Sequence, residues 1–524
     1  MDKVETRSWI PVKPLYTPAD LNGWNYKNKL GDPGEYPFTR GMPVTHDWES
    51  LGASGHYSGF GTPEATNQWL KFLIAEGAMQ VSAGALDLPT QIGYDSDHPF
   101  ALGEVGKSGV AMSSFADFEA VYDGIPTDKI APSSVVAAIA PIFFAWGLAL
   151  FEKRGVPQKQ ARASTQNDPL KEFMCRGTQI FPIQPSVKLT CDVVEYCVRN
   201  GLKKCRPLTV CGSHMRQAGA SAVQEMGFTL ADALVFYDDL LGRGLKVDDF
   251  APYISVFLGG GMDFFEEVCK IRAFRRMWSR TMKERYGSKT PPNIHSRGNG
   301  RDFTAQQPLN NIIRGTIELM AAWIGGCPGC ETSCYDEALA IPTEESLRLA
   351  NRTRQIITFE SGVLNTTDPF AGSYYVEWLT DELEKRAMEL FQKVQDMGGA
   401  VPALEQGFPQ MEIARSAYEK ARQIEVGERI HVGVNKYVTD ETLTINLRKV
   451  DPKEERRQIA RVKKLRKERD NAAVKANLKR LKTAAKEGVN LIPVLIDTVK
   501  TNATVGEMCD VLRSVYGEYK AAGL

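Results

Sequence analysis

The sequence predicts an α/β protein built as a (β/α)8, TIM-like barrel with an extended N-terminal arm and a helical C-terminal extension. Short strand-like runs alternate with longer helical patterns over roughly 350 residues, which is typical of a parallel sheet. The alternating units number about eight, which favours a barrel over an open doubly wound sheet. Residues 1–50 and 431–524 lack this alternation, so we assign them to the arm and the extension and residues 51–430 to the barrel.

Each predicted strand is short and precedes a longer segment with helical spacing of its apolar residues. The strands are expected at 79–83, 133–136, 161–165, 208–211, 253–257 and 293–296. The helices are expected at 117–122, 170–173, 187–200, 218–241, 262–286 and 310–324. The arm is rich in Pro, Gly, Trp and Tyr, and the extension carries a charged helical run over 453–486 and an amphipathic helix over 504–519.

Nearly every predicted strand carries serine or threonine where barrel strands usually carry branched aliphatic residues. Small hydroxyl side chains pointing inward would leave the barrel axis open to a long, thin ligand. The alternative is that they cap the helices that follow. These residues are Ser82, Ser134, Ser164, Ser213, Ser255, Ser296 and Thr332.

Composition excludes several classes of protein. Lys+Arg and Asp+Glu both number 64, which argues against binding nucleic acid or an acidic membrane through bulk charge. No apolar run reaches the roughly 20 residues that span a bilayer, and the N-terminus has no apolar signal core. We therefore expect a soluble, cytoplasmic protein.

The ten cysteines do not indicate a disulfide framework in a chain of this length. One cluster, Cys327, Cys330 and Cys334, has a CxxC spacing followed by a third cysteine, which suits zinc or an iron–sulfur cluster. No fourth cysteine or nearby histidine completes the set, so thiols lining a strand end are the favoured interpretation.

The segment from Leu208 to Gly219 carries the first candidate catalytic residue. A β-branched run ends at Gly212, and Ser213 and His214 stand where an Ala-containing helix begins. In barrel and doubly wound folds the reacting groups lie at such strand-to-helix junctions. The alternative is a core histidine that is hydrogen-bonded to a backbone carbonyl.

A second candidate group follows the predicted strand that ends at Ser164. Gln166 lies in a polar turn, and Arg176 lies on the following helix or just beyond it. A guanidinium can donate two hydrogen bonds to one carboxylate, so Arg176 suits an acidic substrate. The alternative is a surface pair with Glu172 four residues earlier.

Residues 101–108, ALGEVGKS, nearly match a phosphate-binding loop. The first glycine of that motif is Ala101 here, and no strand leads into the segment, so a nucleotide site is not expected.

Motifs shared in the same order over most of the chain resemble those of one family. They are DLPT at 87–90, GYDSD at 93–97, TQND at 165–168, KEFM at 171–174, GSHM at 212–215, DEA at 336–338, DPFAGS at 368–373 and VGVNKY at 432–437. Residues 36–524 resemble the large, substrate-binding subunit of the coenzyme B12-dependent acyl-CoA mutases, the methylmalonyl-CoA mutase family.

The resemblance implies an isomerase whose barrel admits the pantetheine arm of an acyl-CoA and whose mouth is covered by adenosylcobalamin. It implies that His214 hydrogen-bonds the migrating thioester carbonyl and that Tyr57 lies between corrin and substrate. Arg176 would hold a free substrate carboxylate. The other implied substrate contacts are Gln166, Ser164, Ser213, Ser255, His295 and Arg297, and the implied cofactor contacts are Leu86, Leu88, Gly300, Glu337 and Ala338.

The pair Tyr57 and Arg176 favours interconversion of a substituted malonyl-CoA and a succinyl-CoA type thioester, because relatives acting on substrates without a free carboxylate differ at both positions. The chain also departs from the family pattern at positions expected to grip substrate and CoA, namely Pro43, Ser50, Gly55, Ser213, Tyr253 and Arg297. Ser213 and Gly55 remove bulk, so we expect an alkyl- or arylmethyl-malonyl group larger than methylmalonyl.

The family's cobalt-ligating Asp-x-His-x-x-Gly motif does not occur in this sequence. We therefore expect a separate small cobalamin-binding subunit, in a heterodimer or heterotetramer. The alternative is a non-catalytic barrel that acts as a scaffold or chaperone partner of a mutase complex.

Overall fold

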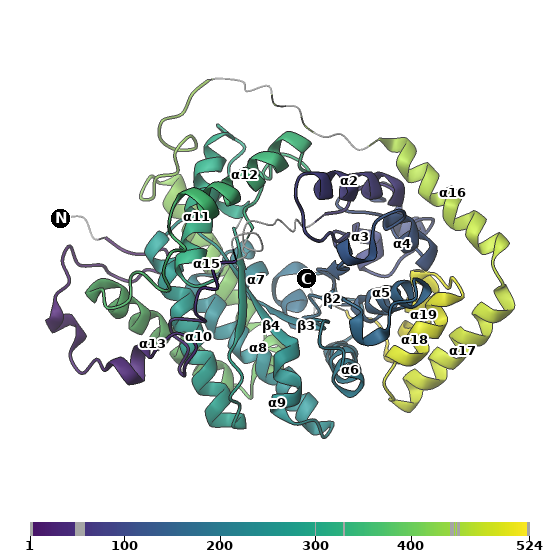
Figure 1. Ribbon diagram of the computed structural model, residues 1–524, viewed down its shortest axis with the longest axis horizontal. Helices are drawn as coiled ribbons and strands as arrows, with labels where there is room; N and C mark the ends of the chain where they lie inside the picture. Colours follow the sequence, from purple (N-terminus) through teal and green to yellow (C-terminus); the bar gives the residue numbers. More distant parts are fainter. Residues whose placement is uncertain are drawn as a thin grey trace. The chain divides into compact units, whose positions relative to one another are not determined.

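The computed structural model describes residues 4–47, 58–298, 300–327, 331–440, 445, 447 and 451–520. The chain forms two compact units (Figure 1), each of which we describe by itself. Unit 1 comprises Met1–Ser54, Cys211–Val235 and Ser255–Arg448. Unit 2 comprises Gly55–Val210, Phe236–Ile254 and Lys449–Leu524. None of the helices in the described parts of the chain is long and apolar enough to cross a membrane.

Unit 1 contains a run of parallel strand pairs in chain order. β4 (Ile254–Gly259) pairs in parallel with β5 (Asn293–Arg297), and Phe257 lies opposite His295. Arg297 continues the run through a parallel bridge to Glu331. The helices of unit 1 are α7 (Ser213–Ala218), the first part of α8 (Ala222–Gly242), α10 (Phe264–Tyr286), α11 (Asn310–Ile324), α12 (Glu344–Glu360), α13 (Tyr374–Asp396), α14 (Ala400–Glu405) and α15 (Phe408–Glu425).

The N-terminal arm lies along α10 in unit 1 (Figure 1). Three arginines of α10 donate to backbone carbonyls of the arm: Arg275 to Thr39 at 3.0 Å, Arg276 to Lys29 at 2.9 Å and Arg280 to Asn28 at 2.6 Å. Two of these carbonyls belong to the last residues of the short turn Tyr26–Leu30, where helical carbonyls have no partner further along the turn, and the guanidinium groups satisfy them. Short helical turns at Pro18–Leu21 and Tyr26–Leu30 interrupt the arm.

Unit 2 contains a second run of parallel pairs, again in chain order. Val81 bridges Ile130, β1 (Ser133–Ser134) pairs with β2 (Ser164–Thr165), and Ser164 bridges Arg206 next to β3 (Leu208–Cys211). The helices are α2 (Pro63–Ala75), α3 (Leu88–Gln91), α4 (Phe115–Val121), α5 (Ala140–Lys153), α6 (Ile183–Asn200), α9 (Val247–Phe250), α16 (Pro452–Glu468), α17 (Asn471–Glu487), α18 (Ile492–Lys500) and α19 (Val505–Tyr516).

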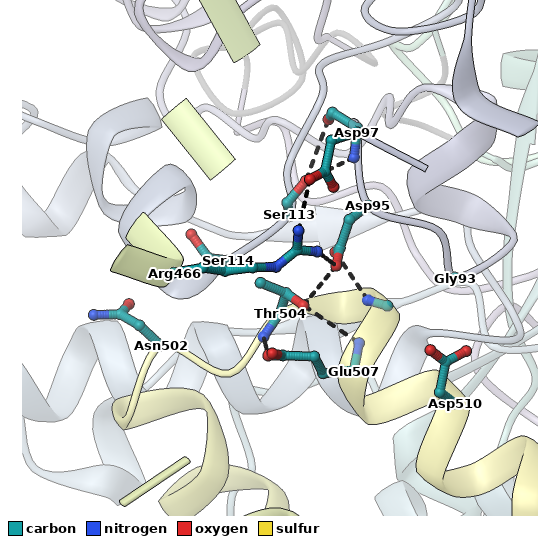
Figure 2. A network of polar contacts seen from close by, with 12 residues as sticks. Gly93, Asp95, Asp97, Ser113, Ser114, Arg466, Asn502, Thr504, Glu507 and Asp510 are labelled. Carbon is teal, nitrogen blue, oxygen red and sulfur yellow. Dashed lines mark hydrogen bonds and ion pairs between the residues drawn. The ribbon is translucent and has the colours of Figure 1, made fainter. Parts of the chain in front are cut away.

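The C-terminal helices of unit 2 are joined to the turn that holds Asp95 and Asp97 (Figure 2). Arg466 of α16 contacts the Asp95 carboxylate at 2.5 Å and the Asp97 carboxylate at 2.6 Å. Asp95 also accepts hydrogen bonds from the Thr504 hydroxyl at 2.6 Å and the Gly506 N–H at 2.9 Å, at the start of α19. Burial raises the pKa of Asp95, and these donors oppose that shift by stabilising its charged form.

The structure confirms a mixed α/β fold with parallel pairing, and a closed barrel stays a prediction. Several expected elements were wrong. Residues 79–83 contribute only a bridge at Val81. The run 453–486 is two helices, because Asp470 accepts from the Ala472 and Ala473 N–H groups and starts a new one. The helix expected over 218–241 begins at Ala222, because Gly219, with φ 121°, ends α7.

Of the hydroxyl residues expected to line the barrel axis, Ser134, Ser213, Ser255, Ser296 and Thr332 are buried. Ser82 keeps part of its surface accessible, and its hydroxyl donates to the Ser133 carbonyl at 2.7 Å. That contact joins neighbouring backbone segments of unit 2. An open axis therefore stays a prediction.

Candidate active site

His214 lies in the first turn of α7, directly after Gly212. The Gly212 N–H donates to the Phe257 carbonyl at 2.9 Å, which attaches the start of α7 to β4. A Cβ atom at Gly212 would clash with the Thr229 hydroxyl, so only glycine fits this junction. The His214 imidazole is half-buried, and its Nδ1 lies 3.2 Å from the Cys211 sulfur. His214 is therefore not a fully enclosed core residue.

The predicted substrate residues of β4 and β5 share one face of the sheet in unit 1. Ser255 pairs with Asn293, Phe257 with His295 and Gly259 with Arg297, so alternate residues of both strands point the same way. The rings of Phe257 and His295 stack with centroids 4.7 Å apart and an interplanar angle of 14°. The structure thus brings Ser255, His295 and Arg297 together on this face.

The His295 side chain is exposed on one side and stacks on Phe257 on the other. The surrounding protein lowers its pKa to about 4 through desolvation. The imidazole is therefore neutral near neutral pH and offers a hydrogen-bond donor and an acceptor without a charge.

The three predicted cofactor contacts of unit 1 lie close together. A Cβ atom at Gly300 would lie 2.7 Å from Cγ of Glu337, so the absence of a side chain at Gly300 permits this approach. Glu337 and Ala338 are both exposed. Glu337 therefore covers Gly300 on one side, while its neighbour Ala338 is open to solvent.

In unit 2, Arg176 is held from two sides. Its Nη1 donates to Glu172 at 3.1 Å and to Thr178 at 3.0 Å, and its Nη2 donates to the Gln91 side-chain oxygen at 2.7 Å. Gln91 is held in turn by its own donor bond to the Leu86 carbonyl at 2.6 Å. The pair with Glu172 exists as expected, but it is not a surface pair, because the Glu172 side chain has no accessible surface.

Glu172 compensates two cations. Lys171, whose side chain is also fully buried, lies 2.8 Å from the same Glu172 oxygen that Arg176 contacts, and its ammonium donates to the Gln166 side chain at 3.4 Å. Although burial opposes it, the charges of Lys171 and Arg176 hold the pKa of Glu172 below its usual value. One carboxylate shared by two cations leaves positive charge for a further anion at Arg176.

The backbone around Arg176 has an unusual local form. Residues Glu172–Arg176 form a π-helical turn, and Gly177 ends it in the left-handed conformation with φ 81°. Such turns often occur at functional sites. The helix expected over 170–173 is present: Leu170 and Lys171 are α-helical, and the chain is π-helical from Glu172.

The remaining predicted residues of unit 2 differ in accessibility. Ser164 is half-buried in β2. Leu88, at the start of α3, is 38% exposed, whereas Leu86 is fully buried and contributes its carbonyl to Gln91. Tyr57 lies outside the described residues.

The cysteine cluster is only partly described. Cys327 and Cys334 are buried and unoxidised, and Cys330 lies outside the described residues. The Cys327 thiol contacts the Ile294 carbonyl at 3.5 Å. Within the part of the chain that the structure describes, no three His, Cys, Asp or Glu side chains are arranged to hold a metal ion.

The glycine-rich segment 101–108 binds carboxylates of the protein itself. The Gly106 N–H donates to Asp87 at 2.8 Å, and the Gly103 N–H donates to Glu455 of α16 at 2.7 Å. Asp87 is fully buried and also caps α3 by accepting from the Thr90 N–H at 3.1 Å. The expectation that no nucleotide binds here agrees with this arrangement.

Asp87 provides a test of the pH dependence of stability. Burial raises its pKa to about 6. Between about pH 4 and pH 6 the folded chain therefore holds a proton that the unfolded chain has released, so this group's contribution to the free energy of unfolding falls as pH rises. The amide of the D87N variant cannot titrate. We expect the stability of wild type relative to D87N to be greater at about pH 4 than at about pH 7 by about 2 kcal/mol.

Urea unfolding of wild type and D87N across this pH range measures the difference. At about pH 7, D87N should still be less stable by about 1–3 kcal/mol, because its amide cannot accept both N–H groups. A difference that does not vary with pH would contradict the buried, proton-binding carboxyl.

Comparisons with known proteins identify the family. The family model for methylmalonyl-CoA mutase matches residues 5–518. The chain belongs to the methylmalonyl-CoA mutase family. It is 40% identical to the 2-hydroxyisobutanoyl-CoA mutase large subunit of Aquincola tertiaricarbonis over 98% of this chain and 92% of that protein. It is 41% identical to methylmalonyl-CoA mutase of Cereibacter sphaeroides, and 37% identical to the human mitochondrial enzyme, over 98% of this chain and 73% and 69% of theirs.

As a member of this cobalamin-dependent family, the chain is an acyl-CoA mutase, an isomerase. Gly300 is half-buried against Glu337, and the exposed Glu337 and Ala338 remain predicted cofactor contacts. The scaffold alternative is not favoured, because the relatives are named as mutases.

Sequence reasoning named Glu172 only as a surface partner of Arg176 and gave no role to the other residues that hold the guanidinium. Lys171, Glu172, Thr178 and Gln91 hold the guanidinium or its partner. A charged pair inside the apolar run Leu170–Met174 was a usable signal for the first two. Gln91 lies 85 residues away from Arg176, and no local pattern indicates that contact.

Proposed function

We propose that the chain is the large, substrate-binding subunit of an adenosylcobalamin-dependent mutase that interconverts a substituted malonyl-CoA and a succinyl-CoA type thioester. The carrying observation is the arrangement of Arg176, which shares the buried Glu172 with Lys171 and keeps 21% of its side chain accessible. A substrate carboxylate at Arg176 would balance the second cation. A substrate without that charge would leave the guanidinium partly uncompensated, which is costly in a desolvated site.

His214 would act on the thioester carbonyl. When the Cys211 thiol donates to Nδ1, the ring carries its proton on Nε2, which can then donate to the carbonyl oxygen as that group migrates. The bond from the Gly212 N–H to the Phe257 carbonyl holds the start of the helix that carries this ring. The cofactor, when bound, supplies the adenosyl radical that starts the rearrangement.

A closed (β/α)8 barrel is part of this proposal, and what supports it is that within each unit the strands pair in parallel with the next along the chain. In this arrangement Gln166, Ser164, Ser213, Ser255, His295 and Arg297 would contact the acyl-CoA, and Tyr57 would separate substrate from corrin. Leu88, Gly300, Glu337 and Ala338 would contact the cofactor through their surfaces, and Leu86 would act through its backbone.

A separate small subunit would carry most of the cobalamin contacts. The relative from Aquincola tertiaricarbonis is named a large subunit, which supports such a partner. A heterodimer or heterotetramer in the cytoplasm is the corresponding assembly.

The acyl group is proposed to be bulkier than methylmalonyl. Ser213 precedes His214 at the start of α7, where the family pattern has tyrosine, and its small side chain leaves room beside the reacting centre. An alkyl- or arylmethyl-malonyl group would occupy that room.

The test is a panel of acyl-CoA substrates with purified chain, small subunit and adenosylcobalamin. It compares methylmalonyl-CoA, larger alkyl- and arylmethyl-malonyl-CoA, and 2-hydroxyisobutanoyl-CoA, which has no free carboxylate. We expect the highest kcat/KM with a larger substituted malonyl-CoA. A higher value with 2-hydroxyisobutanoyl-CoA would refute the role of Arg176, and equal turnover of methylmalonyl-CoA would refute the larger group.

A further inference from the structure

The helix that carries His214 is too short to be stable by itself. α7 has six residues, whereas isolated helices of fewer than about 12 residues are marginal in water. Its orientation therefore depends on contacts with the rest of unit 1. Its start is attached through Gly212, so the contacts at its other end decide whether the helix is fixed along its length.

Three donors converge on the two carbonyls that follow α7. The Gly219 carbonyl accepts from the Ser416 hydroxyl at 2.8 Å and from the Lys420 ammonium at 3.1 Å. The Ala220 carbonyl accepts from Lys420 at 2.9 Å and from Arg216 Nη1 at 2.9 Å. Ser416 and Lys420 both belong to α15, so one helix holds the C-terminal end of another. Donors are favourable there, because helix C-termini carry partial negative charge.

The backbone leaves no space between these helices. Gly219 has φ 121°, and a Cβ atom there would clash with Cβ of Ala417. The glycine thus allows α15 to approach closely enough for both donors to reach the carbonyls. Arg216, one turn earlier, is fixed by Glu267 and donates to Ala220 within the same contact.

Lys420 has no carboxylate within ion-pair distance among the described residues, and it is 6% exposed. Burial, with the charges of Arg216 and Arg301, lowers its pKa to about 6, while Glu266 and Asp302 act in the opposite direction. A buried lysine is retained here through its two backbone acceptors, which need its N–H groups rather than a full charge.

We propose that Lys420 is a positioning residue of the mutase, which together with Ser416 ties α15 to the end of α7 and so fixes the His214 imidazole. This inference rests on the proposed function, because it assigns Lys420 an effect on turnover through His214. Misplacement of a reacting group by about 1 Å can cost roughly 100-fold in rate, so the loss of one such tie is expected to lower kcat.

The first measurement compares K420M with wild type in the complex with small subunit and adenosylcobalamin. We expect kcat to fall roughly 10- to 100-fold with KM within about threefold, because substrate contacts remain while His214 loses its orientation. K420R keeps the donors and should recover most of the activity. K385M, on the exposed face of α13, is the matched control and should behave as wild type.

The second measurement is independent of activity. Hydrogen exchange of the purified full chain should become about tenfold faster over residues 213–220 in K420M, but not in K385M. Unchanged hydrogen exchange in K420M would overturn the proposal. So would faster exchange in K420M with an unchanged kcat, provided that H214A is inactive. If H214A is fully active, the proposed function fails, and the exchange result alone decides whether Lys420 holds α7. If K420M does not fold, S416A replaces it. We expect S416A to lower kcat and to speed hydrogen exchange over residues 213–220, each by less than K420M.

Discussion

Replacing His214 by alanine is expected to lower kcat of the assembled mutase by roughly 10²- to 10⁴-fold, with little change in KM. The half-buried imidazole stands at the junction of β3 and α7, and its Nδ1 is engaged by Cys211 at 3.2 Å. If the Cys211 thiol donates to Nδ1, the ring carries its proton on Nε2, which is the proposed donor to a carbonyl whose charge changes during the rearrangement. An interaction that strengthens in the transition state affects kcat more than binding.

Cys211 supplies the matched test of this assignment. C211S keeps a donor to Nδ1 and should retain most activity, whereas C211V removes it and frees the ring to adopt the other tautomer. We expect C211V to lower kcat by about tenfold in the presence of His214 and to have no further effect in H214A. If C211V and H214A lower kcat additively, Cys211 does not act through His214. If H214A has the kcat of wild type, His214 does not act on the thioester.

The sequence was informative where function depends on a strand-to-helix junction. His214 and Gln166 were found because each follows a short strand, and the structure places both there. Helix α11 was predicted with its observed bounds, since its apolar spacing is regular. Ser255, His295 and Arg297 came from resemblance, and the parallel register of β4 and β5 explains why they share a face.

Features that depend on non-local packing were not predictable in the same way. In the π-helical turn Glu172–Arg176, buried Glu172 contacts Lys171, Arg176 and Thr178, and no periodic pattern encodes such a cluster. The tie between Lys420 and the end of α7 joins residues 200 and 201 positions apart. Local sequence patterns can therefore identify a candidate reacting residue such as His214. The contacts that fix its position come from residues far away in the sequence.

Replacing Arg176 by glutamine is expected to lower kcat/KM for a malonyl-type substrate by roughly 10³-fold, because a bidentate charge-assisted contact is lost in a desolvated site. R176K should recover little, since an ammonium cannot reproduce the planar fork held by Glu172, Thr178 and Gln91. Steady-state kinetics with the acyl-CoA panel measure both effects. R199Q is the control, because Arg199 forms an exposed pair with Glu195 at the same spacing.

The change in substrate preference of R176Q shows whether Arg176 contacts the substrate or only supports the fold. Removing Arg176 leaves Glu172 compensated by Lys171 at 2.8 Å, so the buried carboxylate keeps a partner and the fold should persist. Turnover of carboxylate-free 2-hydroxyisobutanoyl-CoA should then be unchanged or rise in R176Q while malonyl-type turnover falls. Equal losses with both substrate classes would mean that Arg176 supports the π-helical turn rather than the substrate. The two substrate classes differ in whether they bring a free carboxylate to Arg176. The ratio of their kcat/KM values in R176Q, relative to wild type, therefore tells a substrate contact from a structural role.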